Sequence, residues 1–108
     1  IEKMKDASEF FLGKNDLNAF RSVDCQAKSS VRTVDEIKIK KESDLIKLRV
    51  SGRSFLHNQI RIMVGTLIQV GKDIFKETDI KRIIQSKDRK NAGPTAPPSG
   101  LYLEKIIY

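Results

Sequence analysis

The sequence predicts an α+β domain in which helices cover one face of an antiparallel sheet. Two segments in which apolar and charged residues alternate, 37–40 and 46–50, are separated by a short polar stretch, as in a hairpin of two strands. Apolar residues at helical spacing occur before this hairpin and in two segments after it. A last apolar segment, 101–108, predicts a final strand. The predicted order of elements is therefore α-β-β-α-α-β.

The first element is a helix, because Met4, Ala7, Phe11 and Leu12 lie at helical spacing. Gly13 is placed to end this helix in the left-handed conformation. Residues 15–16, an Asn-Asp pair, then predict a turn.

The two strands of the hairpin each have one apolar and one charged face. Residues 41–44 form the predicted loop between them. The apolar residues are Ile37 and Ile39 in the first strand, and Ile46, Leu48 and Val50 in the second.

Two helices are predicted after the hairpin. Ser54 can cap the first, which we expect to end at Gly71, and Thr78 can cap the second. Residues 87–100 contain three prolines and two glycines and predict an ordered loop into the last strand. The apolar stripe is Leu56, Ile60, Met63, Val64 and Leu67 in the first helix, and Ile80, Ile83 and Ile84 in the second.

This order is that of a ferredoxin-like unit, β-α-β-β-α-β, without its first strand. In that topology the first strand lies inside the sheet, between the third strand and the last. Its absence would leave unpaired backbone groups on both sides of a gap. We therefore expect the sheet to be completed by residues before Ile1, by a partner chain, or by a rearrangement of strands.

Composition and charge restrict the classes of function. The 108 residues suit a single folded domain, with 39% hydrophobic and 32% charged residues. The net charge of +7 predicts a polyanionic partner, and the alternative is a basic but inert surface. One cysteine, Cys25, and one histidine, His57, exclude an internal disulfide and a zinc site with three or four N/S ligands. The single cysteine also fits a reducing compartment such as the cytoplasm, and no segment approaches the roughly 20 apolar residues that span a membrane.

Arg61 is the main candidate for a functional residue. It lies between Ile60 and Ile62 in a segment that is otherwise largely apolar. A buried guanidinium needs a carboxylate or phosphate partner, because burying it unpaired is costly. The alternative is an arginine that reaches solvent along its aliphatic stem.

Two segments carry a resemblance to a known family. Segment 55–67 reads Phe-Leu-His-Asn-Gln-Ile-Arg-Ile-Met-Val-Gly-Thr-Leu, and segment 92–103 reads Ala-Gly-Pro-Thr-Ala-Pro-Pro-Ser-Gly-Leu-Tyr-Leu. In sequence, order and spacing they are similar to the C-terminal half of the tRNA pseudouridine synthase A family. The resemblance implies that residues 1–108 are the C-terminal domain fragment of a two-domain isomerase. Such an enzyme converts uridine to pseudouridine in the anticodon arm of tRNA, as a homodimer and without metal or cofactor.

The resemblance also implies roles for single residues. Arg61 would be the charge partner of a catalytic aspartate, keeping that carboxylate ionised and oriented. Leu101 would pack on the uracil ring of a uridine rotated out of its stack, with Gly100 letting the backbone come close. The alternative for these two residues is a strand start that faces the core. We expect the aspartate to lie outside this chain, and the 108 residues alone to be inactive.

Asp35 is the acidic residue whose surroundings most resemble the family's Gly-Arg-Thr-Asp signature. No glycine precedes Arg32, however, and Val34 places the aspartate one residue too late. We therefore do not expect Asp35 to be the nucleophile.

Other basic and polar residues at the ends of elements are candidates for weak RNA contacts. Such residues hold a phosphate backbone without reading its sequence, and the alternative for each is a solvated side chain. For the whole chain, the alternative is a non-catalytic basic α/β module for RNA binding or dimerisation. The RNA-contact candidates are Arg53, His57, Asn58, Lys72, Arg89 and Lys90.

Overall fold

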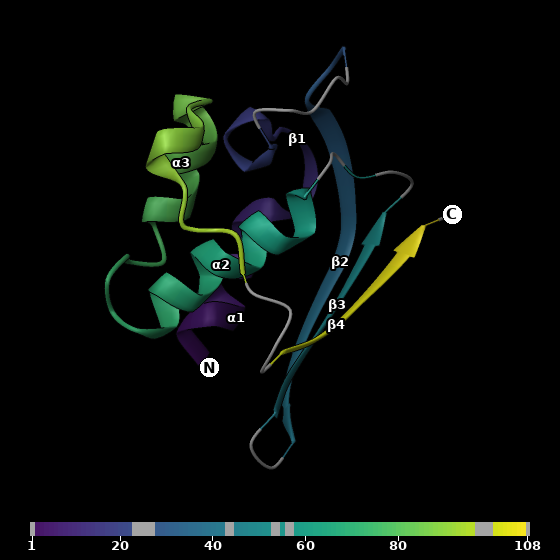
Figure 1. The fold of residues 1–108 in the computed structure, drawn as a ribbon, viewed down its shortest axis with the longest axis vertical. Helices are drawn as coiled ribbons and strands as arrows, with labels where there is room; N and C mark the ends of the chain where they lie inside the picture. The colour runs from purple at the N-terminus through teal and green to yellow at the C-terminus, as the bar shows by residue number, and fades with distance from the viewer. Residues whose placement is uncertain are drawn as a thin grey trace.

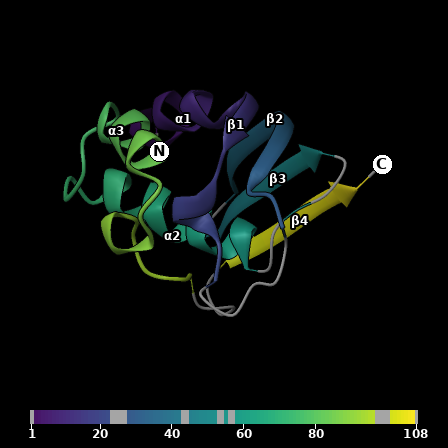
Figure 2. The ribbon, with the colours of Figure 1, turned by 90° about the horizontal axis from the view of Figure 1, so that it is seen from above.

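The fold consists of a layer of helices packed on one face of a four-stranded sheet (Figures 1 and 2). In this computed structural model, only the backbone is described for residues 45 and 101–107. The α+β class and the placement of the helices on a single face of the sheet are as predicted. The residues described are 2–22, 28–42, 45–52, 55, 58–96 and 101–107.

The predicted hairpin is formed by β2 (Val31–Glu42) and β3 (Leu45–Gly52). The two strands are antiparallel, and Ile37 pairs with Val50 while Ile39 pairs with Leu48. Ile39, Leu48 and Val50 are buried under the helices. The apolar alternation therefore predicted both the pairing and the buried face.

The opposite face of the hairpin is charged and exposed. Lys38 lies opposite Arg49, and Lys40 lies opposite Lys47. Like charges directly opposite each other destabilise a sheet. Glu42 offsets part of this repulsion, since its carboxylate lies 2.9 Å from the Lys47 ammonium and 3.8 Å from that of Lys40. The hydrogen bond from Lys47 holds the pKa of Glu42 below its ordinary value.

The predicted turn at residues 15–16 was wrong, because these residues belong to a short strand, β1 (Gly13–Asp16). β1 pairs with β2 in antiparallel fashion, from Gly13 opposite Val34 to Asp16 opposite Val31. Gly13 has the predicted positive φ, +86°, but the first helix already ends at Ser8 and is followed by a 3₁₀ turn up to Phe11. Leu12, predicted to lie on the apolar face of this helix, is instead extended and exposed. Asn15 donates its amide to the carbonyls of Phe11 and Leu12, at 3.1 and 3.2 Å. Pairing with the edge of β2 thus outweighs the local turn preference.

The last strand, β4 (Leu101–Ile107), pairs directly with β3, and the two strands are parallel. The sheet order is β1-β2-β3-β4. The gap expected from the missing strand is therefore closed by strand rearrangement, one of the three solutions predicted. In a ferredoxin-like unit the last two strands run in the same direction on either side of the first. Closing the gap between them produces this parallel pair, joined by a helical crossover.

The helix that carries Arg61 starts later than predicted. α2 spans Gln59–Gly71, and Asn58 before it has a left-handed φ of 58°. A helix from Ser54 would have to pass through Asn58 in the right-handed conformation, so the predicted start was wrong. Ser54 itself lies outside the described residues, and the predicted end at Gly71 is confirmed. Arg61 consequently lies in the first turn of α2.

The hydrophobic core lies between the helices and the sheet. The first helix is α1 (Glu2–Ser8), followed by a 3₁₀ turn, η1 (Glu9–Phe11), and a second 3₁₀ turn, η2 (Asn18–Phe20). The rings of Phe11 and Phe20 pack edge to face with centroids 4.9 Å apart. Other large side chains with almost no exposed surface are Leu17, Leu48, Ile62, Met63, Leu67, Ile80 and Ile83.

The predicted short helix is α3 (Asp79–Ser86), with Ile80 and Ile83 buried and Ile84 partly buried. Thr78 precedes it but makes no capping hydrogen bond with its side chain. Instead, the carboxylate of Asp79 accepts a hydrogen bond from the backbone N–H of Lys76 at 2.8 Å. This bond, aided by the charge of Arg82, lowers the pKa of Asp79.

Asp79→Asn is therefore expected to destabilise the protein only where Asp79 is ionised in the wild type. A carboxylate with a lowered pKa stabilises the fold above its unfolded pKa, and this stability is lost as the pH falls through the folded pKa. We expect the variant to melt at a lower temperature at neutral pH, and the difference to vanish at a pH of about 2.

The control for this prediction is Glu77→Gln, because no hydrogen bond is recorded for that side chain among the described residues. Thermal unfolding at both pH values measures the difference. A deficit of Asp79→Asn that is as large in acid as at neutral pH would contradict the role of the ionised carboxylate.

Candidate functional site

Arg61 and the loop before the last strand, predicted as separate functional segments, are in direct contact. The Nε atom of Arg61 donates a hydrogen bond to the carbonyl oxygen of Ala96, at 3.0 Å. The backbone N–H of Ala96 donates in turn to the carbonyl oxygen of Arg61, also at 3.0 Å. Main chain and side chain of the arginine therefore hold the same residue of the loop.

The segment 92–96, called here the 92–96 loop, lies directly against the backbone of α2. A Cβ atom added to Gly65 would be 1.6 Å from the carbonyl oxygen of Pro94. A Cβ atom added to Gly93 would be 2.9 Å from Cα of Thr66. No other residue type fits such an approach of two backbones, which explains the glycine inside α2 and the one inside the loop.

Two further side chains hold the 92–96 loop. The buried hydroxyl of Thr66 accepts a hydrogen bond from the N–H of Gly93 at 2.9 Å and donates to the carbonyl of Ile62 at 2.8 Å. Arg89, in the 3₁₀ turn η3 (Arg89–Asn91), donates from Nη1 to the carbonyl of Gly93 at 2.9 Å. Its Nη2 atom lies 3.5 Å from the hydroxyl of Thr95. The loop is thus attached to α2 and to η3.

The outer end of the Arg61 guanidinium has no acidic partner in the described part of the chain. The structure records only the bond of Nε to Ala96 there, and no carboxylate oxygen within the 4.0 Å of an ion pair. Arg61 is partly buried and is the third residue of α2. Its charge therefore adds to the partial positive charge of the helix N-terminus. Together they favour an anionic group at this end of α2.

The other residues that the sequence singled out for RNA contact or catalysis do not lie together in one group. Asn58 directly precedes α2, whereas the exposed Lys72 follows its last residue, so the two lie about 20 Å apart along the helix. Lys90 is exposed and adjacent to Arg89. Asp35 is exposed and lies at the irregularity of β2 between Val34 and Glu36. Leu101 begins β4 opposite Ile46, and its side chain is not described. Arg53, His57 and Gly100 lie outside the described residues.

The arrangement of helix and loop belongs to a sequence that matches a known family over most of its length. The sequence model of tRNA pseudouridine synthases matches residues 7–108. The chain belongs to this family. The tRNA pseudouridine synthase A of Wolbachia pipientis wMel is 48% identical over 108 residues, and that of Ehrlichia canis (strain Jake) is 47% identical over the same length. Both alignments cover all of this chain and 44% of the relative, so the chain spans less than half the length of these relatives.

Sequence reasoning on this synthase segment missed the residues that attach the loop. Gly65, Thr66 and Gly93 were not singled out, and Arg89 was predicted only as an RNA contact. One signal was present: a glycine within a helix costs about 0.5–1 kcal/mol relative to alanine and marks a close approach. The side-chain bonds of Thr66 and Arg89 left no comparable signal in the sequence, because their partners are 27 and 4 residues away in an irregular loop.

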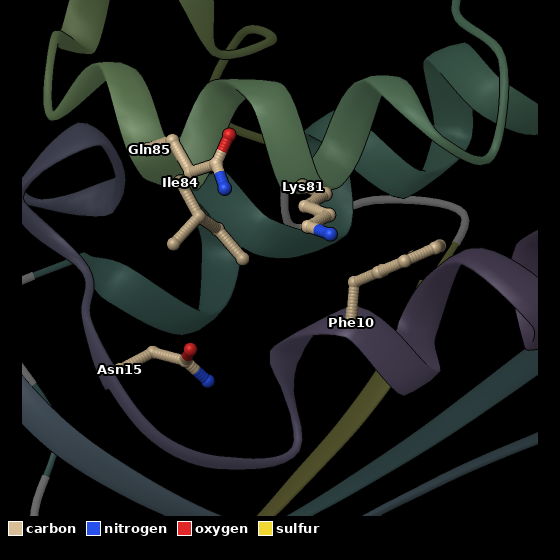
Figure 3. Close-up of a pocket in the computed structure, with 5 residues that line it drawn as sticks. All are labelled: Phe10, Asn15, Lys81, Ile84 and Gln85. Carbon is tan, nitrogen blue, oxygen red and sulfur yellow. The ribbon is translucent and has the colours of Figure 1, made fainter.

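A separate hollow of about 270 Å³ lies between α3, η1 and β1 (Figure 3). Ile84, Lys81 and Gln85 reach toward it from α3, while Phe10 and Asn15 line the opposite side. The amide of Asn15 is already bound to two backbone carbonyls. The residues that line the hollow therefore offer one lysine, the amide of Gln85 and apolar surface, and they include no pair of groups for acid-base chemistry.

Two further classes of site find no support in the described residues of the chain. No group of three or more His, Cys, Asp or Glu side chains is placed to bind a metal there. Among the same residues, no helix has both the length and the apolar character needed to cross a bilayer.

Proposed function

We propose that this chain is the C-terminal domain of a two-domain enzyme that isomerises uridine to pseudouridine in the anticodon arm of tRNA. The support for the family is the match over residues 7–108. The observation that carries the mechanism is the guanidinium of Arg61, whose Nε is bound to Ala96 and whose two terminal nitrogens have no described partner. A guanidinium of this kind suits a carboxylate, which it can bind with two parallel hydrogen bonds.

In this proposal the carboxylate is a catalytic aspartate supplied by sequence outside residues 1–108. The charge of Arg61 holds the pKa of that aspartate low and fixes its orientation. The aspartate attacks or deprotonates the nucleoside, and the bond between the ribose and the uracil nitrogen breaks. The uracil then turns, and its carbon 5 bonds to the ribose as any bond between ribose and aspartate breaks. Carbon 5 loses its proton, and the ring nitrogen that left the ribose gains one. The reaction is an isomerisation and needs no cofactor.

The other candidate residues would serve the substrate. Leu101 would pack on the rotated uracil, and Gly100 would allow the backbone to approach it. Basic side chains would hold phosphates, which fits the net charge of +7. We propose that the enzyme acts as a homodimer in the cytoplasm. The basic residues proposed for this role are Arg53, Lys72 and Lys90, with His57 and Asn58 as polar contacts. Arg89, also predicted as an RNA contact, has its guanidinium bound to the 92–96 loop instead.

The proposal predicts that the complete enzyme converts uridine in tRNA, whereas residues 1–108 alone do not. Release of tritium from tRNA labelled at carbon 5 of uracil measures the reaction directly, because that position loses its proton. A purified 108-residue chain that releases tritium, and loses this activity on Asp35→Ala, would contradict the assignment of the aspartate to another part of the protein.

The second candidate is a non-catalytic basic module that binds RNA or a partner subunit, and the observation that favours it is the positive net charge alone. An assay of the complete protein distinguishes the two candidate functions. A complete protein that binds tRNA but releases no tritium from it would support the module and contradict the enzyme.

A further inference from the structure

The position of the Arg61 guanidinium depends on the 92–96 loop. Its recorded side-chain bond is to the carbonyl of Ala96, which is buried at the end of this loop. The loop in turn is held at Gly93 and Thr95, by Thr66 and Arg89. A chain of hydrogen bonds therefore leads from these two side chains through the loop to Arg61.

We propose that Thr66 and Arg89 are positioning residues that hold Arg61 in place for the isomerisation. This inference rests on the proposed function, because it assumes that Arg61 serves a catalytic carboxylate. Neither residue needs to touch the substrate. Each acts by fixing the backbone of the loop against which the guanidinium is bound.

Thr66 is suited to this role because its hydroxyl is fully buried and has two bonds at once. It lies one turn after Ile62, the neighbour of Arg61, and bridges that turn to Gly93. Valine has the same shape without the hydroxyl, so Thr66→Val leaves the buried N–H of Gly93 without its partner. Thr66→Ser restores the hydroxyl and is the matched control.

Arg89 is suited to the positioning role because its guanidinium contacts two residues of the 92–96 loop. Nη1 binds the carbonyl of Gly93 at 2.9 Å, and Nη2 approaches the hydroxyl of Thr95 at 3.5 Å. Lysine keeps the charge but cannot bind both atoms with a planar fork. Arg89→Lys therefore separates two roles: an RNA phosphate contact tolerates this change, and a positioning role does not. Lys81, exposed on α3 and not among the residues proposed to contact RNA, offers Lys81→Ala as the control for lost charge.

The test is single-turnover pseudouridine formation by the complete enzyme at saturating tRNA, with tRNA affinity measured separately. We expect Thr66→Val and Arg89→Lys to lower the rate about ten- to a hundredfold, because small displacements of a catalytic group have effects of this size. Affinity for tRNA should stay close to wild type in both. Thr66→Ser and Lys81→Ala should keep most of the wild-type rate.

The pH dependence of the rate distinguishes positioning from mere stability. If Arg61 is displaced, the carboxylate that it serves regains a higher pKa, and the acidic limb of the profile moves to higher pH. We expect this shift in Thr66→Val, and we expect Thr66→Ser to keep the acidic limb of the wild type. A role in stability alone would lower the melting temperature and leave the acidic limb unchanged.

Each contrary result has a defined meaning. Wild-type rate and acidic limb in folded Thr66→Val would overturn the inference for Thr66. Weaker tRNA binding at an unchanged saturating rate in Arg89→Lys would make Arg89 an RNA contact and overturn its part. If Arg61→Ala also keeps the wild-type rate, the proposed function itself fails. If Arg61→Ala loses activity while the other variants do not, only the positioning inference fails.

Discussion

Arg61→Ala in the complete enzyme is expected to lower the rate of pseudouridine formation at saturating tRNA by about a hundred- to a thousandfold. Losing one preorganised donor at a catalytic charge has effects of this size. The guanidinium is the positive group at the start of α2, and the described residues offer it no acidic partner. Removing the guanidinium should therefore lower the rate of the step that depends on the carboxylate, and it should weaken tRNA binding far less.

Two comparisons sharpen this prediction. Arg61→Lys keeps the charge but not the fork geometry of the guanidinium, so we expect it to recover only part of the rate. Lys81→Ala removes an exposed positive charge on α3 and should leave the rate near that of the wild type. Equal losses in rate and in tRNA affinity for Arg61→Ala would instead make Arg61 an RNA contact.

Gly65→Ala is expected to destabilise the protein by about 2 kcal/mol and to displace the 92–96 loop. The added Cβ would overlap the carbonyl of Pro94, at 1.6 Å, and neither backbone can move away cheaply. Overpacking of this kind costs typically about 1–3 kcal/mol, which exceeds the roughly 0.5–1 kcal/mol that alanine contributes to a helix relative to glycine. Because the loop holds Arg61, the rate at saturating tRNA should fall as well.

A glycine-to-alanine substitution at the other glycine of α2, Gly71, provides the control. At Gly71 the added Cβ meets only the flexible end of Met4, whose sulfur lies at 3.0 Å. We expect Gly71→Ala to change the melting temperature little and to leave the rate unaffected. If Gly65→Ala melts no lower than Gly71→Ala in thermal unfolding, the close packing of the loop on α2 is wrong.

The elements with strong periodicity were predicted well. The alternation in β2 and β3 established the hairpin and its buried face, and the apolar spacing of Ile80 and Ile83 established α3. The errors lie where local and distant preferences compete. Asn15 and Asp16 favour a turn, yet the open edge of β2 offers their backbone hydrogen bonds. Ser54 was a reasonable cap, yet the left-handed Asn58 delays the helix to Gln59.

The sequence indicated the segments of the candidate site in part. Arg61 was singled out because it is a single charge in an apolar segment and because of the family resemblance, and the loop was predicted from its prolines and glycines. Their contact through Ala96 was not foreseen, and neither was the attachment of the loop by Thr66 and Arg89. These bonds join residues by direction and distance in space, which the spacing of residues along the chain does not encode.

The amino-acid sequence alone was therefore enough for the class of fold, the hairpin and the family, and it also led to the prediction of a role for Arg61. All of these depend on residue type and on periodicity, which are properties of the chain itself. Only the tertiary structure decided the parallel pairing of β3 with β4 and the close contact of the 92–96 loop with Gly65. Both are contacts between distant segments, and they form because backbone groups at an open sheet edge and at a close helix approach must find partners.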